Sequence, residues 1–188
     1  MMKKLLTCWL VAVMLMLMSS AASAATVDEK KDAVRKAVAE TLQTLYKLQP
    51  SAQAAVEGNA GYAVFNNIGT KIFITGGGKG KGLAVNNNDK TETFMKMVEL
   101  QVGFGFGIKE FSVIFVFETE EALNTFVNQG WEFGGQATLA ATDNVNGGSM
   151  AGAASISPGV WMYQLTKKGL AAEITAKGTR YYKDGDLK

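Results

Sequence analysis

The chain has 188 residues, of which 47% are hydrophobic and 19% are charged, with a formal net charge of +2, a single cysteine and no histidine. Ser-His-Asp hydrolases, cysteine proteases and the common zinc and non-haem iron sites depend on imidazole or thiolate, so a composition with no histidine and a single cysteine excludes them. We therefore expect a protein that is not an enzyme and has no metal and no cofactor. A glycosidase carboxylate pair stays open as an alternative, although no pair stands out among Glu99, Glu110, Glu118, Glu120, Glu121, Glu132 and Glu173.

Residues 1–24 are predicted to form a secretory signal peptide. Two lysines precede an apolar run that ends at Met18, and Ala22-x-Ala24 has the pattern of a cleavage site. The apolar run is shorter than the roughly 20 residues of a membrane-spanning helix. The predicted signal contains Cys8, so thiol chemistry is also excluded for the mature chain. We expect an exported protein, located in the periplasm and peripheral on a membrane.

Cleavage after residue 24 leaves one domain, residues 25–188, and its 188 − 24 = 164 residues suffice for one compact core. The signal removes two of the 19 basic residues and none of the 17 acidic ones, so the mature chain is formally neutral (17 − 17 = 0). We therefore expect no nucleic-acid partner, and any binding of anions must come from local patches.

The mature chain begins with an expected amphipathic helix. Apolar residues recur at helical spacing from Val27 to Leu48, charged residues lie between them, and the pattern stops before Pro50. Residues 51–57 are expected to add a short helical segment. The apolar stripe of the first helix can pack either on a sheet or on a membrane surface, and the sequence leaves both open, although the absence of Trp and Phe favours the sheet.

Glycine-rich strands follow. Short strands are expected at 61–65, 70–75 and 80–86, and glycines recur at every second residue from Gly76 to Gly82, which would leave one strand face as bare backbone. Such a face indicates sharp sheet curvature or a group packed close to the backbone. A phosphate-binding P-loop would need glycine at position 75 and Ser or Thr at 82, whereas the chain has Thr75 and Gly82.

The remaining residues continue the sheet around one further helix. Strands are expected at 91–106, with a break, and at 111–118. Thr119 is expected to cap a helix that stops at Gly130. The other expected elements are a strand at 133–141, a loop or weak strand at 143–158, and a hairpin of 160–165 with 170–176. The fold class expected is α+β: a curved, glycine-rich, mostly antiparallel and in the extreme barrel-like sheet, with an N-terminal amphipathic helix and one inserted helix.

Three blocks of this sequence resemble, in the same order, the SYLF lipid-binding domain that also occurs in yeast actin regulators. The resemblance spans roughly residues 34–183, and the blocks read GYAVFNNIGTKIFITGGGKGKGLAV, LQVGFGFGIKEFSVIFVFETEEALNTFVNQGWEFGGQATLAA and VWMYQLTKKGLAAEITAKGTRYYKD. The chain departs from the family pattern at Asn66, where a proline is common, and at Glu173, where a glycine is common. The resemblance implies a glycine-rich, mostly antiparallel domain that binds anionic phospholipid.

Eukaryotic SYLF domains prefer phosphoinositides, and some bind actin. For an exported chain with a bacterial style of signal, the resemblance implies phosphatidylglycerol or cardiolipin instead.

The expected lipid-binding residues are basic side chains on the glycine strand, its neighbour and the C-terminal segment: Lys71, Lys79, Lys81, Lys167, Lys168, Lys177 and Arg180. Lys79 and Lys81 are expected on the strand face opposite the glycines. The alternative interpretation is that these are ordinary solvated cations. At the level of function, the alternative to a lipid binder is a periplasmic structural or stress-response scaffold without a lipid ligand.

A barrel of membrane-spanning strands is disfavoured, because the run from Val113 to Val116 is apolar on both strand faces.

Overall fold

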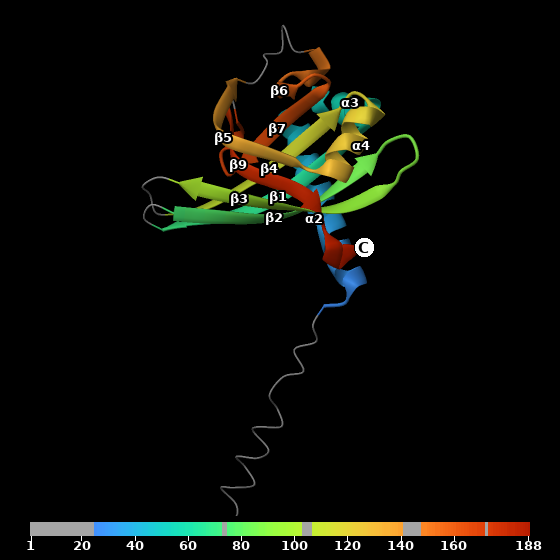
Figure 1. Cartoon of the computed structure of the whole chain (residues 1–188). Coiled ribbons are helices and arrows are strands. Elements are labelled where there is room, and N and C mark those ends of the chain that lie inside the picture. Colours follow the sequence, from blue (N-terminus) through green and yellow to red (C-terminus); the bar gives the residue numbers. More distant parts are fainter. Residues whose placement is uncertain (1–24, 73–74, 103–106, 141–147, 172) are drawn as a thin grey trace, which may run out of the picture.

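The computed structural model describes residues 25–72, 75–102, 107–140, 148–171 and 173–188 (Figure 1), so the predicted signal peptide lies outside the described residues. Within this part of the chain there are three α-helices and one nine-stranded sheet. The helices are α2 (Val27–Leu48), α3 (Ser51–Gly58) and α4 (Glu120–Gln129). The strands are β1 (Gly61–Ile72), β2 (Thr75–Asn86), β3 (Glu92–Val102), β4 (Gly107–Phe117), β5 (Trp131–Ala140), β6 (Ala154–Ser157), β7 (Val160–Thr166), β8 (Gly169–Leu170) and β9 (Glu173–Lys183). Two short 3-10 turns, η1 (Gly148–Met150) and η2 (Gly185–Leu187), complete the elements.

All strand pairs of the sheet are antiparallel, in the order β5-β9-β3-β2-β1-β4-β7-β6, and β8 pairs with β7. The strands β1 to β4 form its centre and pair along most of their length (Figure 1). The late strand β9 lies between β3 and β5, although β3 and β9 are far apart in the sequence. The sheet is therefore assembled from hairpins and from four pairings between non-consecutive strands, namely β1–β4, β4–β7, β3–β9 and β5–β9.

The sheet curls into a half-barrel, and an aromatic cluster fills its inner face. The rings of Phe115 on β4 and Tyr181 on β9 lie 5.0 Å apart, although β1, β2 and β3 separate these strands within the sheet. Phe65 on β1 contacts both rings. A flat sheet with strands about 4.8 Å apart would keep β4 and β9 far beyond ring contact, so the curvature expected from the glycines is confirmed.

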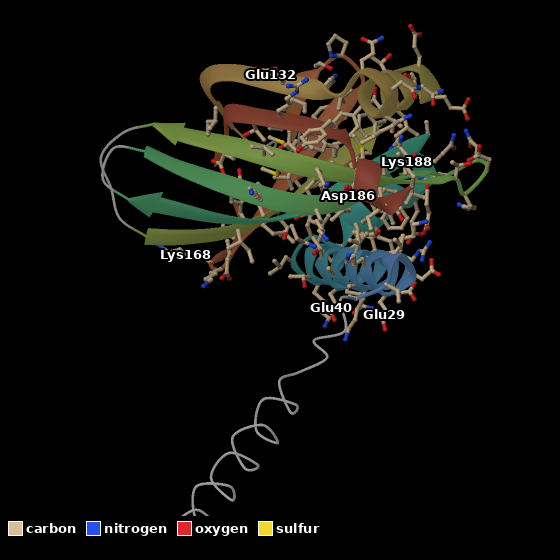
Figure 2. The ribbon with its side chains drawn as sticks, turned by 60° about the horizontal axis from the view of Figure 1, so that its bottom comes forward. Glu29, Glu40, Glu132, Lys168, Asp186 and Lys188 are labelled. Atoms are coloured by element: carbon tan, nitrogen blue, oxygen red, sulfur yellow. The ribbon has the colours of Figure 1, made fainter. Side chains whose placement is uncertain are left out.

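Helix α2 packs on the outer face of the sheet, as Figure 2 shows from below. The Thr26 hydroxyl accepts a hydrogen bond from the Glu29 amide, and the Glu29 carboxylate accepts one from the Thr26 amide. These two bonds form a capping box at the first turn of the helix. Val34, Val38 and Leu45 are buried in the outer core cluster with residues of β1, β2 and β4. The expected helix is thus confirmed, and its apolar stripe is used for packing on the sheet.

Helix α4 closes one end of the inner core. Its cap is Thr119, whose side chain accepts a hydrogen bond from the Ala122 amide, and it ends at Gly130 with φ 71°. Leu123 and Phe126 are buried among the inner aromatic rings. The predicted cap and glycine stop are confirmed.

Two predictions about strands were wrong in part. The segment 61–72 is a single strand, because it pairs without a break with both β2 and β4. The expected hairpin of 160–165 with 170–176 is limited to the pairs Leu165–Leu170 and Thr166–Gly169. The chain then leaves β7, because β9 gains hydrogen-bonding partners on both edges by entering between β3 and β5.

Candidate functional site

A row of residues in direct register crosses the outer face of the sheet. Lys79 on β2 pairs with Ile68 on β1 and with Val98 on β3, and Val98 pairs with Arg180 on β9. Register partners share one face of a sheet, so these four side chains lie on the same side. Glu110 and Glu132 continue the row at its two ends. Neighbouring strands are about 4.8 Å apart, which places Lys79 and Arg180 about 10 Å apart at the backbone.

The glycines of β2 form the opposite face, which is buried. A β-carbon on Gly78 would come within 2.7 Å of the Asn67 side-chain nitrogen, and one on Gly80 within 2.8 Å of the Asn66 carbonyl oxygen. The prediction that a group packs closely against the glycine backbone is therefore confirmed. Lys79 and Lys81 are exposed, as expected for the face away from the glycines.

A second row lies one step closer to helix α2. Asn66, Lys81, Lys96 and Tyr182 follow one another across β1, β2, β3 and β9. The Lys96 ammonium group binds Asp184 at 2.8 Å and also Asp186, both in the C-terminal turn. Within the described residues, no carboxylate forms an ion pair with Lys79, Lys81 or Arg180, so these cations remain available to a ligand.

The ion pairs of the C-terminal turn shift two pKa values. Hydrogen bonds to Asp184 and Asp186 raise the pKa of Lys96 above its ordinary value. The Lys96 ammonium group in turn lowers the pKa of Asp186, with smaller contributions from Lys30 and Lys81. Lys96 therefore stays charged but is used internally.

Exposed apolar side chains accompany the cations on this face. Ile68 is 63% exposed and Leu100 is 68% exposed. Leu100 lies two residues beyond Val98 on β3 and so shares its face. Ile68 and Leu100 are large apolar side chains that lie in the open beside cations without an ion pair among the described residues. Such a combination is typical of a surface that contacts another molecule.

The other expected site residues do not join this face as a group. Lys167, on the β7–β8 turn, forms an ion pair with Glu110 at 3.2 Å. Lys168 is exposed on the same turn and lies to the left of Asp186 in Figure 2. Lys71 pairs in register with Gly76 and Gly107, and Lys177 with Gln136, but the side chains of both lysines lie outside the described part of the structure. Arg180 lies on β9 in register with Val98 and Glu132, so the structure places it in the row of Lys79, whereas Lys167 and Lys168 lie on the β7–β8 turn.

A groove of about 440 Å³ lies between α2 and strands β1, β4 and β7. Its polar wall includes Asn66, whose side-chain oxygen accepts hydrogen bonds from Thr41 and Ser112. Its charged residues are Glu40, Glu110 and Lys167. Two carboxylates against one ammonium group disfavour an anionic ligand in this groove.

A smaller hollow of about 210 Å³ lies on the other flank of α2, lined by Lys30, Ala33, Val34, Ala37, Asn66 and Lys81. The sequence analysis did not select Lys30, because one lysine among alternating charges on an amphipathic helix carries no local signal. Only the combination of residues is informative, because Lys30, Ala33, Val34 and Ala37 share one face of the helix and so place a lysine beside two small side chains.

Two of the glutamates that left a glycosidase open, Glu99 and Glu118, have structural partners. Glu99 is buried on the inner face, where its carboxylate accepts a hydrogen bond from Asn67 at 2.9 Å. Glu118 accepts one from the Trp161 indole. In the parts of the chain that the structure describes, no three His, Cys, Asp or Glu side chains come together as a metal site would require. Nor is any helix in those parts long and apolar enough to cross a membrane.

A comparison with protein families gives one match. Residues 98–188 match the model of the Ysc84 family, described as Las17-binding protein actin regulator. This is the SYLF family to which the three sequence blocks pointed. The match begins within β3, so it includes Val98, Leu100 and Arg180, whereas α2, β1 and β2 lie before it. No curated protein matches the chain.

Proposed function

We propose that the chain binds anionic phospholipid headgroups on the outer face of its sheet. The proposal is supported by the match of residues 98–188 to the Ysc84 (SYLF) family, a family of non-catalytic binding domains. The observation that carries the proposal is the register of three residues. Val98 lies between the cations Lys79 and Arg180, neither of which has an ion pair among the described residues. We further propose that the protein is exported and acts in the periplasm, as a peripheral membrane protein.

The composition of the face supports a membrane more than a small soluble anion. A cation near an anionic bilayer contributes roughly 1 kcal/mol, and this attraction decays within a Debye length of about 8 Å at physiological salt. Lys79, Lys81 and Arg180 together would give about 3 kcal/mol, which is weak and sensitive to salt. The exposed Ile68 and Leu100 can add a contribution that salt does not screen. Phosphatidylglycerol and cardiolipin are the anionic lipids we propose.

Co-sedimentation with vesicles tests the proposal. The protein should bind vesicles of phosphatidylglycerol in phosphatidylcholine, should not bind phosphatidylcholine alone, and should be released as salt rises. Lys79→Glu with Arg180→Glu should abolish binding. The matched control is Lys36→Glu with Lys47→Glu, which makes the same change in charge at exposed positions of α2 and should retain binding apart from a small general loss.

Three results would count against the proposed lipid function. Equal binding to neutral and anionic vesicles would show that the cations have no role. Equal loss in the two double variants would show that only net charge matters. Absence of binding to any vesicle would favour the alternative, a periplasmic structural or stress-response scaffold without a lipid ligand.

A further inference from the structure

The hollow between α2 and β2 is lined by hydrogen-bond donors and apolar groups, without a carboxylate. Its polar residues are Lys30 from α2, Lys81 from β2 and Asn66 from β1, and Asn66 and Lys81 are register partners. The side-chain oxygen of Asn66 faces Thr41 and Ser112. Its side-chain nitrogen has no hydrogen-bond partner among the described residues and keeps its donors for a ligand. Two lysines and one asparagine therefore line one small space.

The space exists because α2 presents alanines to the sheet at this point. Ala33 and Ala37 lie one turn apart on the helix face that also carries Lys30. Longer side chains at these positions would fill the hollow. Its volume of about 210 Å³ equals several water molecules at about 30 Å³ each, so a tetrahedral oxyanion fits within it.

The charges around the hollow favour an anion. Lys96, the next cation of the row, is held by Asp184 and Asp186, and Asp186 also attracts Lys30 and Lys81 from a distance. Three ammonium groups against two carboxylates leave a net charge of 3 − 2 = +1. Lys30 and Lys81 have no ion pair among the described residues, so their charge is not neutralised by a direct contact.

We infer that this hollow is a phosphate-binding site in which the ammonium groups of Lys30 and Lys81 and the amide nitrogen of Asn66 donate to the phosphate oxygens. The ligand class is a terminal phosphate group, as found in a lipid with a phosphomonoester headgroup or in a soluble phosphate compound. A terminal phosphate carries close to two charges at neutral pH and three acceptor oxygens, which match a pocket that offers only donors. The lipid source rests on the proposed membrane function, whereas the site itself does not.

Titration of the protein with inorganic phosphate, followed by backbone NMR at constant ionic strength with chloride as reference, tests the site. Phosphate should shift the resonances of residues around Lys30, Ala37 and Lys81. Lys30→Gln and Lys81→Gln should each weaken phosphate binding about tenfold, as expected for the loss of one charge-assisted hydrogen bond. Lys36→Gln, an equal change on an exposed face of the same helix, should leave it unchanged.

Vesicles separate the two sources of phosphate. If the ligand is a lipid, phosphatidic acid vesicles should bind more tightly than phosphatidylglycerol vesicles of equal surface charge, and Lys30→Gln should remove this difference. If the ligand is soluble, inorganic phosphate binds but the two vesicles do not differ. Lys79→Gln should weaken vesicle binding in both cases without affecting inorganic phosphate.

The inference is overturned if phosphate causes no more shift than chloride, or if Lys36→Gln weakens phosphate binding as much as Lys30→Gln does. In that case vesicle binding through Lys79 and Arg180 would still stand. Conversely, phosphate binding without any vesicle binding would reject the proposed membrane function and retain the site. Far-ultraviolet circular dichroism of each variant shows that the fold is intact.

Discussion

The ring of Phe65 lies against the backbone of Gly82, its register partner on β2, in the space that a β-carbon at position 82 would occupy. The same β-carbon would also overlap the carbonyl oxygen of Val64. Phe65 contacts Phe115 and Tyr181, so the absence of a side chain at Gly82 lets the inner aromatic cluster reach the sheet backbone. The glycine is therefore a packing requirement of the curled sheet.

Gly82→Ala is predicted to destabilise the protein by about 1–3 kcal/mol, since Val64 and Phe65 must both shift to admit the methyl group. Gly77→Ala is the matched control, because it lies on the exposed face of the same strand and its β-carbon would meet only the Glu99 carbonyl oxygen at 3.6 Å. It should leave stability unchanged or slightly increased. Urea unfolding at pH 7 measures both. Equal stability of the two variants would contradict the packing argument.

Asp184→Asn is predicted to lower the free energy of unfolding by roughly 1–3 kcal/mol. Asp184 is buried and binds the Lys96 ammonium group at 2.8 Å, and asparagine keeps a side-chain oxygen for the turn but loses the charge. Asp186→Asn, at the exposed partner of the same lysine, should lower the free energy of unfolding much less, because solvent screens an exposed ion pair. Urea unfolding of the two variants measures both free energies of unfolding. A larger decrease for Asp186→Asn than for Asp184→Asn would show that the buried contact is not the stronger one.

The same ion pairs predict a dependence on acid. The Lys96 ammonium group lowers the pKa of Asp186 below its ordinary value of 3.8. A lowered pKa means that the stabilisation is present above pH 3.8 and is lost as the pH falls below it, because the unfolded state then binds the proton more readily. The difference in melting temperature between the native protein and Asp186→Asn should therefore disappear between pH 5 and pH 2. A difference that persists at pH 2 would exclude this origin.

Buried tyrosines predict a loss of stability in alkali. Burial raises the pKa of Tyr163 to about 12, and it also raises the pKa of Tyr46 and Tyr181. A raised pKa means that the stabilisation is complete below about pH 10, where an unfolded tyrosine ionises, and is lost as the pH rises toward 12. The melting temperature should fall steeply above pH 10, and tyrosinate absorbance should rise with unfolding. Full ionisation of all tyrosines near pH 10 in a folded protein would contradict this.

Ile68→Ser with Leu100→Ser is predicted to weaken vesicle binding chiefly at high salt. Both side chains are exposed, so their removal should change stability by less than about 0.5 kcal/mol. The apolar contribution of a membrane contact is not screened by ions, whereas that of Lys79 and Arg180 is. Co-sedimentation with phosphatidylglycerol vesicles across a salt series measures the effect. An equal proportional loss at every salt concentration would assign the binding to charge alone.

The sequence predicted the features that arise from local spacing. Alternation of glycine with lysine predicted correctly that Lys79 and Lys81 lie opposite a bare strand face, because side-chain direction in a strand has period two. Helix α4 was predicted because its cap at Thr119 and its stop at Gly130 are local signals. The order of the three blocks identified the family.

Long-range placement could not be read from the sequence. Nothing near Arg180 indicates that β9 enters between β3 and β5, so the sequence does not predict that Arg180 lies in one row with Lys79. The approach of Lys30 to Lys81 depends on how α2 crosses the sheet, which no spacing within the helix specifies. The ion pair of Asp184 with Lys96 joins segments that are far apart in the chain, so no local sequence pattern predicts it.

The position of β9 has a consequence for how the chain reaches its native state. Both β3 and β5 are made long before β9, yet β9 is the sheet partner that joins them, as in the pairs Met97–Tyr181 and Trp131–Tyr181. Until β9 arrives, an edge of β3 and the whole of β5 expose unpaired backbone groups, which are templates for aggregation. Pairings of such sequence separation form slowly. A chaperone that shields these edges would therefore matter most for nascent or truncated chains that lack residues 173–183.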